Sequence, residues 1–227
     1  MKALLAILLS MLHAGCANTP ATAPEPDKPK FRTDIVITTG VHGNEPSGYL
    51  VQDKLKEMGF TVFGPCNPWG IANGKRHLRD GRDLNRCFAL TDCAEAEAVR
   101  EFLRNNKPGL LLDLHEDPDG THPYLIQNGP EDDIGRRIID ALKSKYEFDT
   151  APSWSFVEGK DGLIKPPREL LAMQKLTRVY SLGYYTWLTY GCTAFTVECP
   201  GSWPEEKRKK YCLRVCEVAR ALFSGVR

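Results

Sequence analysis

Short apolar runs alternate with segments of helical periodicity along most of the chain. Four apolar runs are predicted to form buried strands, at residues 34–39, 60–63, 109–114 and 194–197. Four further segments are predicted as helices, at residues 46–58, 94–105, 134–145 and 204–222. Pro46 suits a first helical position and Gly59 suits a helix stop, which supports the first of these helices. Strands that alternate with helices predict an α/β fold with a layered sheet.

The first residues have the pattern of an export signal. Lys2 precedes an apolar run over residues 3–12, which is too short to span a bilayer and suits a signal peptide over residues 1–15. The run is followed by small residues and then Cys16, a pattern that resembles a bacterial lipobox, although His13 stands where such sites usually carry leucine. We expect Cys16 to be lipidated after cleavage, with ordinary secretory cleavage as the alternative.

Proline recurs in the segment after Cys16, so residues 16–33 are predicted to be a lipidated, extended tether in front of a catalytic domain at 34–227. We therefore expect a membrane-anchored lipoprotein of the cell envelope that faces the periplasm, or else a secreted periplasmic protein. The 30 basic and 29 acidic residues nearly balance, which gives no indication of nucleic-acid binding. Seven cysteines follow Cys16, so an exported chain should contain disulfides with at least one thiol left over.

Metal-ligating residue types stand at the ends of two predicted strands. His42 and Glu45 follow the first strand, and His115 follows the central apolar run. Two imidazoles and a carboxylate form a catalytic zinc pattern that leaves a fourth position open. His77 and His122 are the alternative imidazoles outside the signal segment.

Two further carboxylates have candidate roles beside these ligands. Asp113 shares a strand face with His115 and could support it, because side chains alternate along a strand. Glu198 ends an apolar strand, where a buried charge needs a partner, so it is either a cap or a base that serves the metal site. Glu116 is a rival base, but its neighbour His115 should point to the opposite face.

The order of these motifs resembles the zinc metallocarboxypeptidase family. The nearest branch resembles the succinylglutamate desuccinylase/aspartoacylase-like group and the bacterial murein-peptide amidases. The resemblance covers residues 34–201 and rests on four motifs, which are His42-x-x-Glu45, Asp83-Leu84-Asn85-Arg86, His115 and Glu198. It implies a mixed, largely parallel central sheet flanked by helices in three layers.

The resemblance also implies a role for each matched residue. His42, Glu45 and His115 would hold one Zn²⁺, and Glu198 would be the general base that accepts a proton from the attacking water. Asn85 and Arg86 match the pair that binds a substrate carboxylate, and Asp83 matches the residue that contacts the first zinc histidine. The arginine that stabilises the oxyanion would be Arg76 in preference to Arg79. One tyrosine of Tyr180, Tyr184, Tyr185 and Tyr190 could also reach the site.

These matches predict a zinc-dependent hydrolase that cuts an amide bond next to a free carboxylate. Together with the export signal, they favour a carboxypeptidase or amidase that acts on cell-wall peptides. The alternative is an N-acyl amino acid deacylase, whose substrate would be a small acyl-amino acid, and the less favoured alternative is a zinc- or murein-binding module without activity. The segment after Glu198 has room for one helix, so we expect an open cleft.

Overall fold

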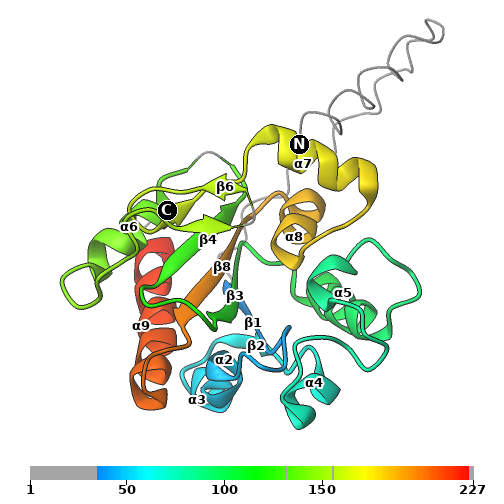
Figure 1. The fold of residues 1–227 in the computed structure, drawn as a ribbon, viewed down its shortest axis with the longest axis horizontal. Helices are drawn as coiled ribbons and strands as arrows, with labels where there is room; N and C mark the ends of the chain where they lie inside the picture. Colours follow the sequence, from blue (N-terminus) through cyan, green and yellow to red (C-terminus); the bar gives the residue numbers. More distant parts are fainter. Residues whose placement is uncertain (1–34, 131, 155, 225–227) are drawn as a thin grey trace, which may run out of the picture.

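The computed structural model describes residues 35–130, 132–154 and 156–224, coloured along the chain in Figure 1. Its strands are β1 (Ile35–Thr39), β2 (Thr61–Phe63), β3 (Leu110–Asp117), β4 (Tyr124–Asn128), β5 (Ser153–Trp154), β6 (Val157–Glu158), β7 (Leu163–Ile164) and β8 (Thr193–Pro200). Its helices are α2 (Ser47–Leu50), α3 (Gln52–Glu57), α4 (Pro68–Asn73), α5 (Ala94–Asn106), α6 (Ile134–Leu142), α7 (Arg168–Thr177), α8 (Leu182–Tyr190) and α9 (Glu205–Ser224), with a 3-10 turn η1 (Leu84–Arg86).

A six-stranded sheet in the order β2-β1-β3-β8-β4-β7 forms the centre of the fold. Strands β2, β1, β3 and β8 run parallel, while β4 pairs antiparallel with β8 and parallel with β7. The sheet is therefore mixed and largely parallel, as the sequence predicted. Because β1, β3 and β8 are adjacent, their carboxyl ends bring His115 and Glu198 into direct register beside the loop that follows β1.

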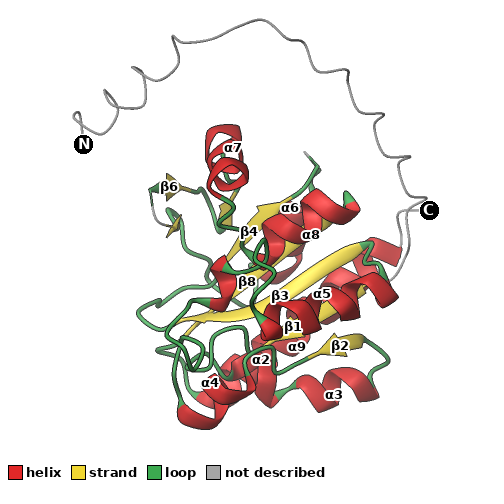
Figure 2. Ribbon diagram, turned by 90° about the vertical axis from the view of Figure 1, so that its right-hand side faces the viewer, coloured by secondary structure: helices red, strands yellow, loops and turns green. Residues whose placement is uncertain are grey.

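Helices cover both faces of the sheet, which gives three layers (Figures 1 and 2). One core joins alternate strand residues, such as Ile37 and Leu112, to α3, α6 and α9. The second core joins the opposite strand faces, such as Val36 and Leu111, to α5 and the start of α8. Near-continuous apolar strands are required for this arrangement because both faces of the sheet are buried.

Most predicted elements are present, but their bounds differ. The helix expected at 46–58 is divided into α2 and α3, because Val51 has a non-helical conformation with φ −108° and ψ 0°. The central strand extends to Asp117 and the last strand to Pro200, past the apolar runs that predicted them. The predicted signal peptide (1–15), Cys16 and the tether (16–33) lie outside the described residues, as does Asp34 at the expected domain start.

Two expectations from the sequence need correction or completion. Strand β4, which lies between β8 and β7 in the sheet, was not predicted from the sequence, and neither were α7 and α8. The seven cysteines of the described residues are buried free thiols rather than members of disulfides. Within the described ranges, no helix combines the length and the apolar character needed to cross a bilayer.

Candidate active site

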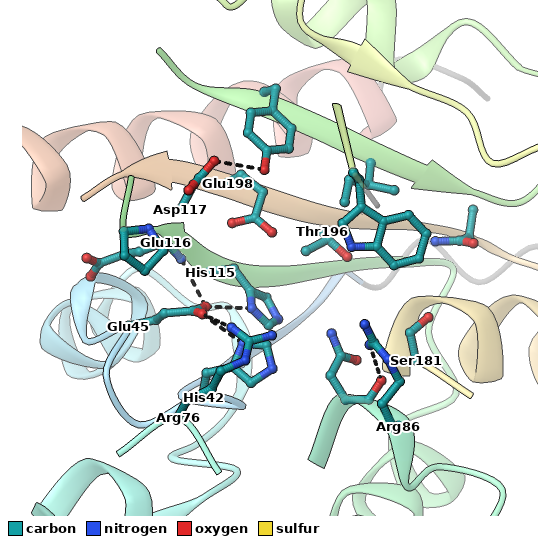
Figure 3. A pocket seen from close by; sticks show the side chains of 16 residues that line it. His42, Glu45, Arg76, Arg86, His115, Glu116, Asp117, Ser181, Thr196 and Glu198 are labelled. Carbon is teal, nitrogen blue, oxygen red and sulfur yellow. Dashed lines mark hydrogen bonds and ion pairs between the residues drawn. The ribbon is translucent and has the colours of Figure 1, made fainter. Parts of the chain in front are cut away.

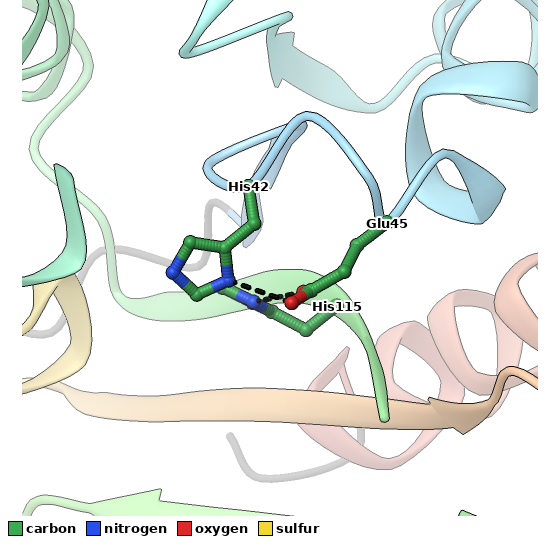
Figure 4. A group of neighbouring side chains, drawn as sticks. All are labelled: His42, Glu45 and His115. Carbon is green, nitrogen blue, oxygen red and sulfur yellow. Dashed lines mark hydrogen bonds and ion pairs between the residues drawn. The ribbon is translucent and has the colours of Figure 1, made fainter. Parts of the chain in front are cut away.

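Three buried side chains converge at the carboxyl end of the sheet. His42 and Glu45 come from the loop between β1 and α2, and His115 comes from β3 (Figure 4). The candidate ligand atoms of the three residues lie within 4.8 Å of one another. The Glu45 carboxylate lies between the two imidazoles, with Oε1 2.9 Å from Nδ1 of His42 and Oε2 2.8 Å from Nδ1 of His115. The sequence-predicted ligand residues are thus brought together.

The close turn that carries His42 depends on Gly43. A Cβ at this position would lie 1.9 Å from the carbonyl carbon of Gly70, a distance that no side chain could tolerate. The amide of Gly43 donates to the carbonyl of Lys75 at 3.0 Å, which fixes the loop against the segment after α4. The loop can therefore aim His42 and Glu45 at one point only because residue 43 has no side chain.

The Nε2 atom of each histidine contacts a further carboxylate, a different one for each ring. Nε2 of His42 lies 3.1 Å from Oδ1 of Asp83, and Nε2 of His115 lies 2.8 Å from Oδ2 of Asp113. The hydroxyl of Thr38 donates to the other oxygen of Asp113 at 2.8 Å. A histidine that donates from Nε2 keeps Nδ1 as an acceptor, so both rings are oriented to offer Nδ1 to a metal.

These contacts change the proton affinities of the buried groups. Burial opposes ionisation of Glu45, but hydrogen bonds from His115 and His42 hold the pKa of its carboxyl well below the usual value. Burial likewise opposes the charge on His115, while the charge and hydrogen bond of Asp113 raise its pKa well above the usual value. The hydrogen bond with His42, with help from the charges of Arg76 and Arg86, outweighs burial and lowers the pKa of Asp83. The carboxyl groups of Glu45 and Asp83 are therefore ionised near neutral pH.

Glu198 and Glu116 differ in what they contact. Glu198 lies on β8 directly beside His115, lines the cavity of the site and makes no hydrogen bond through its side chain to the described residues. Its pKa is raised to about 8 by burial first, and then by the nearby charges of Glu45, Asp117 and Asp113, although His115 opposes this. Glu116 also borders the cavity, but its carboxylate accepts from the amide of Ser47 and pairs with Arg208. Glu198 is thus the carboxylate free to move a proton.

The two candidate arginines are placed differently. Arg76 lines the cavity, with Nη1 2.7 Å from Oε1 of Glu45 and Nη2 3.4 Å from Oδ2 of Asp83. Arg79 is exposed and does not line the cavity. The alternative imidazoles His77 and His122 also lie outside it.

Arg86 lies across a cavity of about 170 Å³ from the metal-ligand group (Figure 3), and Asn85 lines the same cavity. Oδ1 of Asn85 accepts from the amide of Leu182 at 2.8 Å, so its amide nitrogen is left to donate into the cavity. The guanidinium of Arg86 donates to the carbonyl of Asn85 at 2.8 Å and lies 5.9 Å from the centre of the Trp154 ring. No carboxylate of the described residues pairs with it at salt-bridge distance, so Arg86 is available to bind an anion.

Several lining residues were not anticipated from the sequence. They are Asp117, Pro118, Tyr124, Ile126, Asn128, Trp154, Ser181 and Thr196. Most come from β4 and the segments beyond it, and β4 has no distinguishing sequence motif. The tyrosine that lines the cavity is Tyr124, whose hydroxyl donates to Asp117 at 3.1 Å. The four tyrosines singled out from the sequence do not line it.

The donor set fits a divalent transition metal such as zinc. Two imidazole nitrogens and one carboxylate oxygen are all buried and meet at one point, and three protein ligands with an accessible side form the pattern of a catalytic centre. Asp83 and Asp113 complete it, because metal-bound histidines characteristically donate their second nitrogen to a carboxylate.

Comparison with known proteins gives consistent results. The model of the succinylglutamate desuccinylase/aspartoacylase catalytic domain matches residues 32–165, more than half of the chain. A curated protein named "Probable aspartoacylase" from Acaryochloris marina is 31% identical over 101 residues, which are 36% of this chain and 34% of that protein. This match therefore spans only about a third of that relative's length.

Solved structures show the same fold at low sequence identity. A protein from Shewanella denitrificans OS217 named "putative metallopeptidase" superposes with a TM-score of 0.68 at 19% identity, covering 83% of this chain and 74% of that one. The D,L-carboxypeptidase Csd4 of Helicobacter pylori, in its mDAP-bound form, superposes with a TM-score of 0.61 at 15% identity, covering 84% of this chain and 51% of that one.

Proposed function

This chain belongs to the succinylglutamate desuccinylase/aspartoacylase catalytic-domain family, and on that basis we propose that it is a zinc-dependent hydrolase that cuts an amide bond next to a free carboxylate. The observation that carries the proposal is one cavity with three elements: the ligand group of His42, Glu45 and His115, the unpaired carboxylate of Glu198, and the unpaired guanidinium of Arg86. A hydrolase of this kind needs these three parts within one substrate length of each other.

Each of these residues has a defined part in the reaction. Zinc, when bound, supplies a Lewis acid that activates water and polarises the scissile carbonyl. The positive charge of a bound metal would favour the ionised form of Glu198, which would then accept the proton of the attacking water and deliver it to the leaving amine. Arg76 stabilises the negative charge that develops on the carbonyl oxygen. At the far end, Arg86 and the amide nitrogen of Asn85 bind the substrate carboxylate, which orients the amide bond for attack.

Murein peptides are the substrate class that we favour, because stem peptides end in carboxylates and the sequence of the first residues predicts export. The fold shared with Csd4, whose name states D,L-carboxypeptidase activity, supports this choice. We further propose that Cys16 is lipidated and tethers the domain to the envelope membrane on its periplasmic side. Incubation of the zinc-loaded protein with purified murein, followed by mass analysis, should give products shortened at a free carboxyl end.

The carboxylate requirement can be tested with two substrates and two proteins. Wild type and Arg86→Ala are each assayed on a murein peptide with a free terminal carboxylate and on its terminal amide. Charged hydrogen bonds contribute about 1.5–3 kcal/mol each, so wild type should prefer the acid by roughly tenfold to more than a hundredfold in kcat/KM. Arg86→Ala should lose most of this preference. If wild type cut both forms equally, an endopeptidase would replace the carboxypeptidase proposal.

An N-acyl amino acid deacylase is the second candidate. It is favoured by the family match and by the identity to the protein named "Probable aspartoacylase". A direct comparison of N-acyl amino acids with peptides of two or more residues, at equal zinc loading, separates the two. Hydrolysis confined to the small acyl amino acids would establish the deacylase.

A further inference from the structure

One carboxylate of the cavity has neither a cationic partner nor a part in the proposed reaction. Asp117 lines the cavity, and no basic side chain of the described residues pairs with it at salt-bridge distance. Of the other lining carboxylates, Glu45 belongs to the metal-ligand group and Glu198 is the proposed base. Glu116 is paired with Arg208. Because a partly buried charge without a partner is costly, Asp117 indicates a positive charge that the substrate supplies.

The side chain of Asp117 is held in a fixed orientation at the end of β3. Its Oδ2 accepts from the hydroxyl of Tyr124 at 3.1 Å, and its Oδ1 accepts from the amide of Asp119 at 3.2 Å. The carbonyl of Asp117 also accepts from the amides of Gly120 at 3.1 Å and Gly201 at 2.7 Å. Tyr124 is only 6% exposed. The carboxylate is therefore oriented before any ligand binds, which lowers the entropic cost of binding.

Asp117 and Tyr124 together offer only hydrogen-bond acceptors to the cavity. The hydroxyl of Tyr124 gives its one proton to Asp117, so it can only accept from a further group, and a carboxylate has no proton to give. A ligand group at this place must therefore donate. An ammonium group donates three hydrogen bonds and also balances the negative charge. A carboxylate of the ligand would find no donor here and would be repelled.

Asp117 lies on the far side of the reacting groups from Arg86. It follows His115 by two residues on β3, so both side chains share one face of the strand. Tyr124 lies opposite Glu198 in register. Figure 3 shows Asp117 and Arg86 on opposite sides of Glu198. With the substrate carboxylate at Arg86, the acyl part beyond the scissile bond therefore faces Asp117.

We propose that Asp117, oriented by Tyr124, binds an ammonium group on the acyl part of the substrate. The cavity then selects molecules that carry a carboxylate on one side of the scissile amide and an amine on the other. The inference rests on the proposed function, because Arg86 determines which side of the amide faces Asp117. Peptides with a free amino group should be preferred to acyl amino acids, and a succinyl group, whose tip is a carboxylate, should be accepted poorly.

The test uses two pairs of substrates that share one C-terminal residue and differ in the acyl group. The first pair is alanyl and 2-methylpropanoyl, and the second is 4-aminobutyryl and pentanoyl. Within each pair an ammonium group replaces a methyl group, and the two pairs place it near to or further from the scissile carbonyl. Wild type should prefer the amine in at least one pair by about tenfold or more in kcat/KM. A succinyl substrate should be cut more slowly than the pentanoyl substrate.

Asp117→Asn keeps the shape of the side chain and an acceptor for Tyr124 but removes the charge, so it should lose most of the preference for the amine. The ratio within a pair is the readout, because a charge lost near Glu198 changes the rates on both members alike. Tyr124→Phe should show a smaller loss in the same direction. Asp53→Asn, whose side chain is 84% exposed on α3, is the control of equal charge change and should keep the wild-type ratio. No preference for the amine in either pair, or a preference that Asp117→Asn retains, would overturn the assignment.

Binding measurements keep this inference separate from the proposed function. Dissociation constants for the same substrates are measured with zinc-loaded Glu198→Gln, with and without Asp117→Asn. Tighter binding of the amine that disappears with Asp117→Asn supports the ammonium site even if wild type cuts none of the substrates, a result that would count against the proposed function alone. Equal binding of the amine and methyl members of both pairs would count against the ammonium site.

Discussion

Replacing Asp113 with asparagine should weaken metal binding without disturbing the fold. Asp113 is fully buried, its Oδ2 lies 2.8 Å from Nε2 of His115, and its Oδ1 accepts from the Thr38 hydroxyl at 2.8 Å. An asparagine has the same shape. Its oxygen can accept from His115, and its amide nitrogen can donate to Thr38, whose hydroxyl can turn to accept. Only the negative charge behind the ligand histidine is removed.

The size of the effect follows from this geometry. Loss of a partner behind a metal-bound histidine typically lowers metal affinity by about 10- to 100-fold, which corresponds to about 1.4–2.7 kcal/mol. The loss of affinity in Asp113→Asn should lie near the upper end of this range, because the contact between Asp113 and His115 is short and completely buried. Asp83→Asn should fall near the lower end, because the contact to His42 is 3.1 Å and the Asp83 side chain is 18% exposed.

Competition with a chromophoric chelator at neutral pH gives the zinc dissociation constants of wild type and both variants. Thermal unfolding of the metal-free proteins provides the control, since it separates lost affinity from lost fold. An unchanged dissociation constant for Asp113→Asn, or a larger loss for Asp83→Asn, would refute the assignment of Asp113 as the principal support of the ligand group.

Three further predictions concern the base, the buried ion pair and the anchor. Glu198→Gln should lower turnover on the order of 10²–10⁴-fold with zinc content unchanged by elemental analysis, and an active variant would exclude Glu198 as the base. Arg208→Ala removes the ion-pair partner of the buried Glu116 carboxylate and should lower the free energy of unfolding by about 3–5 kcal/mol in denaturant unfolding. The double variant Arg208→Met with Glu116→Gln should recover most of this loss. Equal instability of the single and double variants would contradict the reasoning. Cys16→Ser should abolish labelling by a fatty-acid analogue in cells, and equal labelling of this variant would disprove lipidation.

The central part of the fold could be predicted because its signals are local and strong. The runs that became β1, β3 and β8 are almost entirely apolar, since helices cover both faces of the sheet. The residues at the ends of these strands are polar where a core would be apolar, so His115 and Glu198 stood out. The parallel pairing of the three strands then brings them together without any further information.

The side wall of the cavity could not be predicted in the same way. Strand β4 has the sequence Tyr-Leu-Ile-Gln-Asn, in which apolar and polar residues do not alternate clearly, so it has no strong strand pattern. Its place beside β8 depends on antiparallel pairing across more than 60 residues of sequence. Asn128 and Thr196 are common residue types, and only their place on neighbouring strands of the folded sheet brings them to the cavity. The tyrosine of the cavity, Tyr124, was missed for the same reason.

The antiparallel strand β4 has a consequence for how such an enzyme can change during evolution. The proposed metal ligands and the proposed base stand at or just after the ends of β1, β3 and β8, whereas one wall of the cavity comes from β4, which provides none of them. Substitutions at Ile126 or Asn128 can therefore alter which molecule is accepted while the reacting groups keep their positions. A lineage with this architecture can acquire new substrates by single mutations that leave its chemistry intact, and a library of variants confined to these two positions would sample that capacity directly.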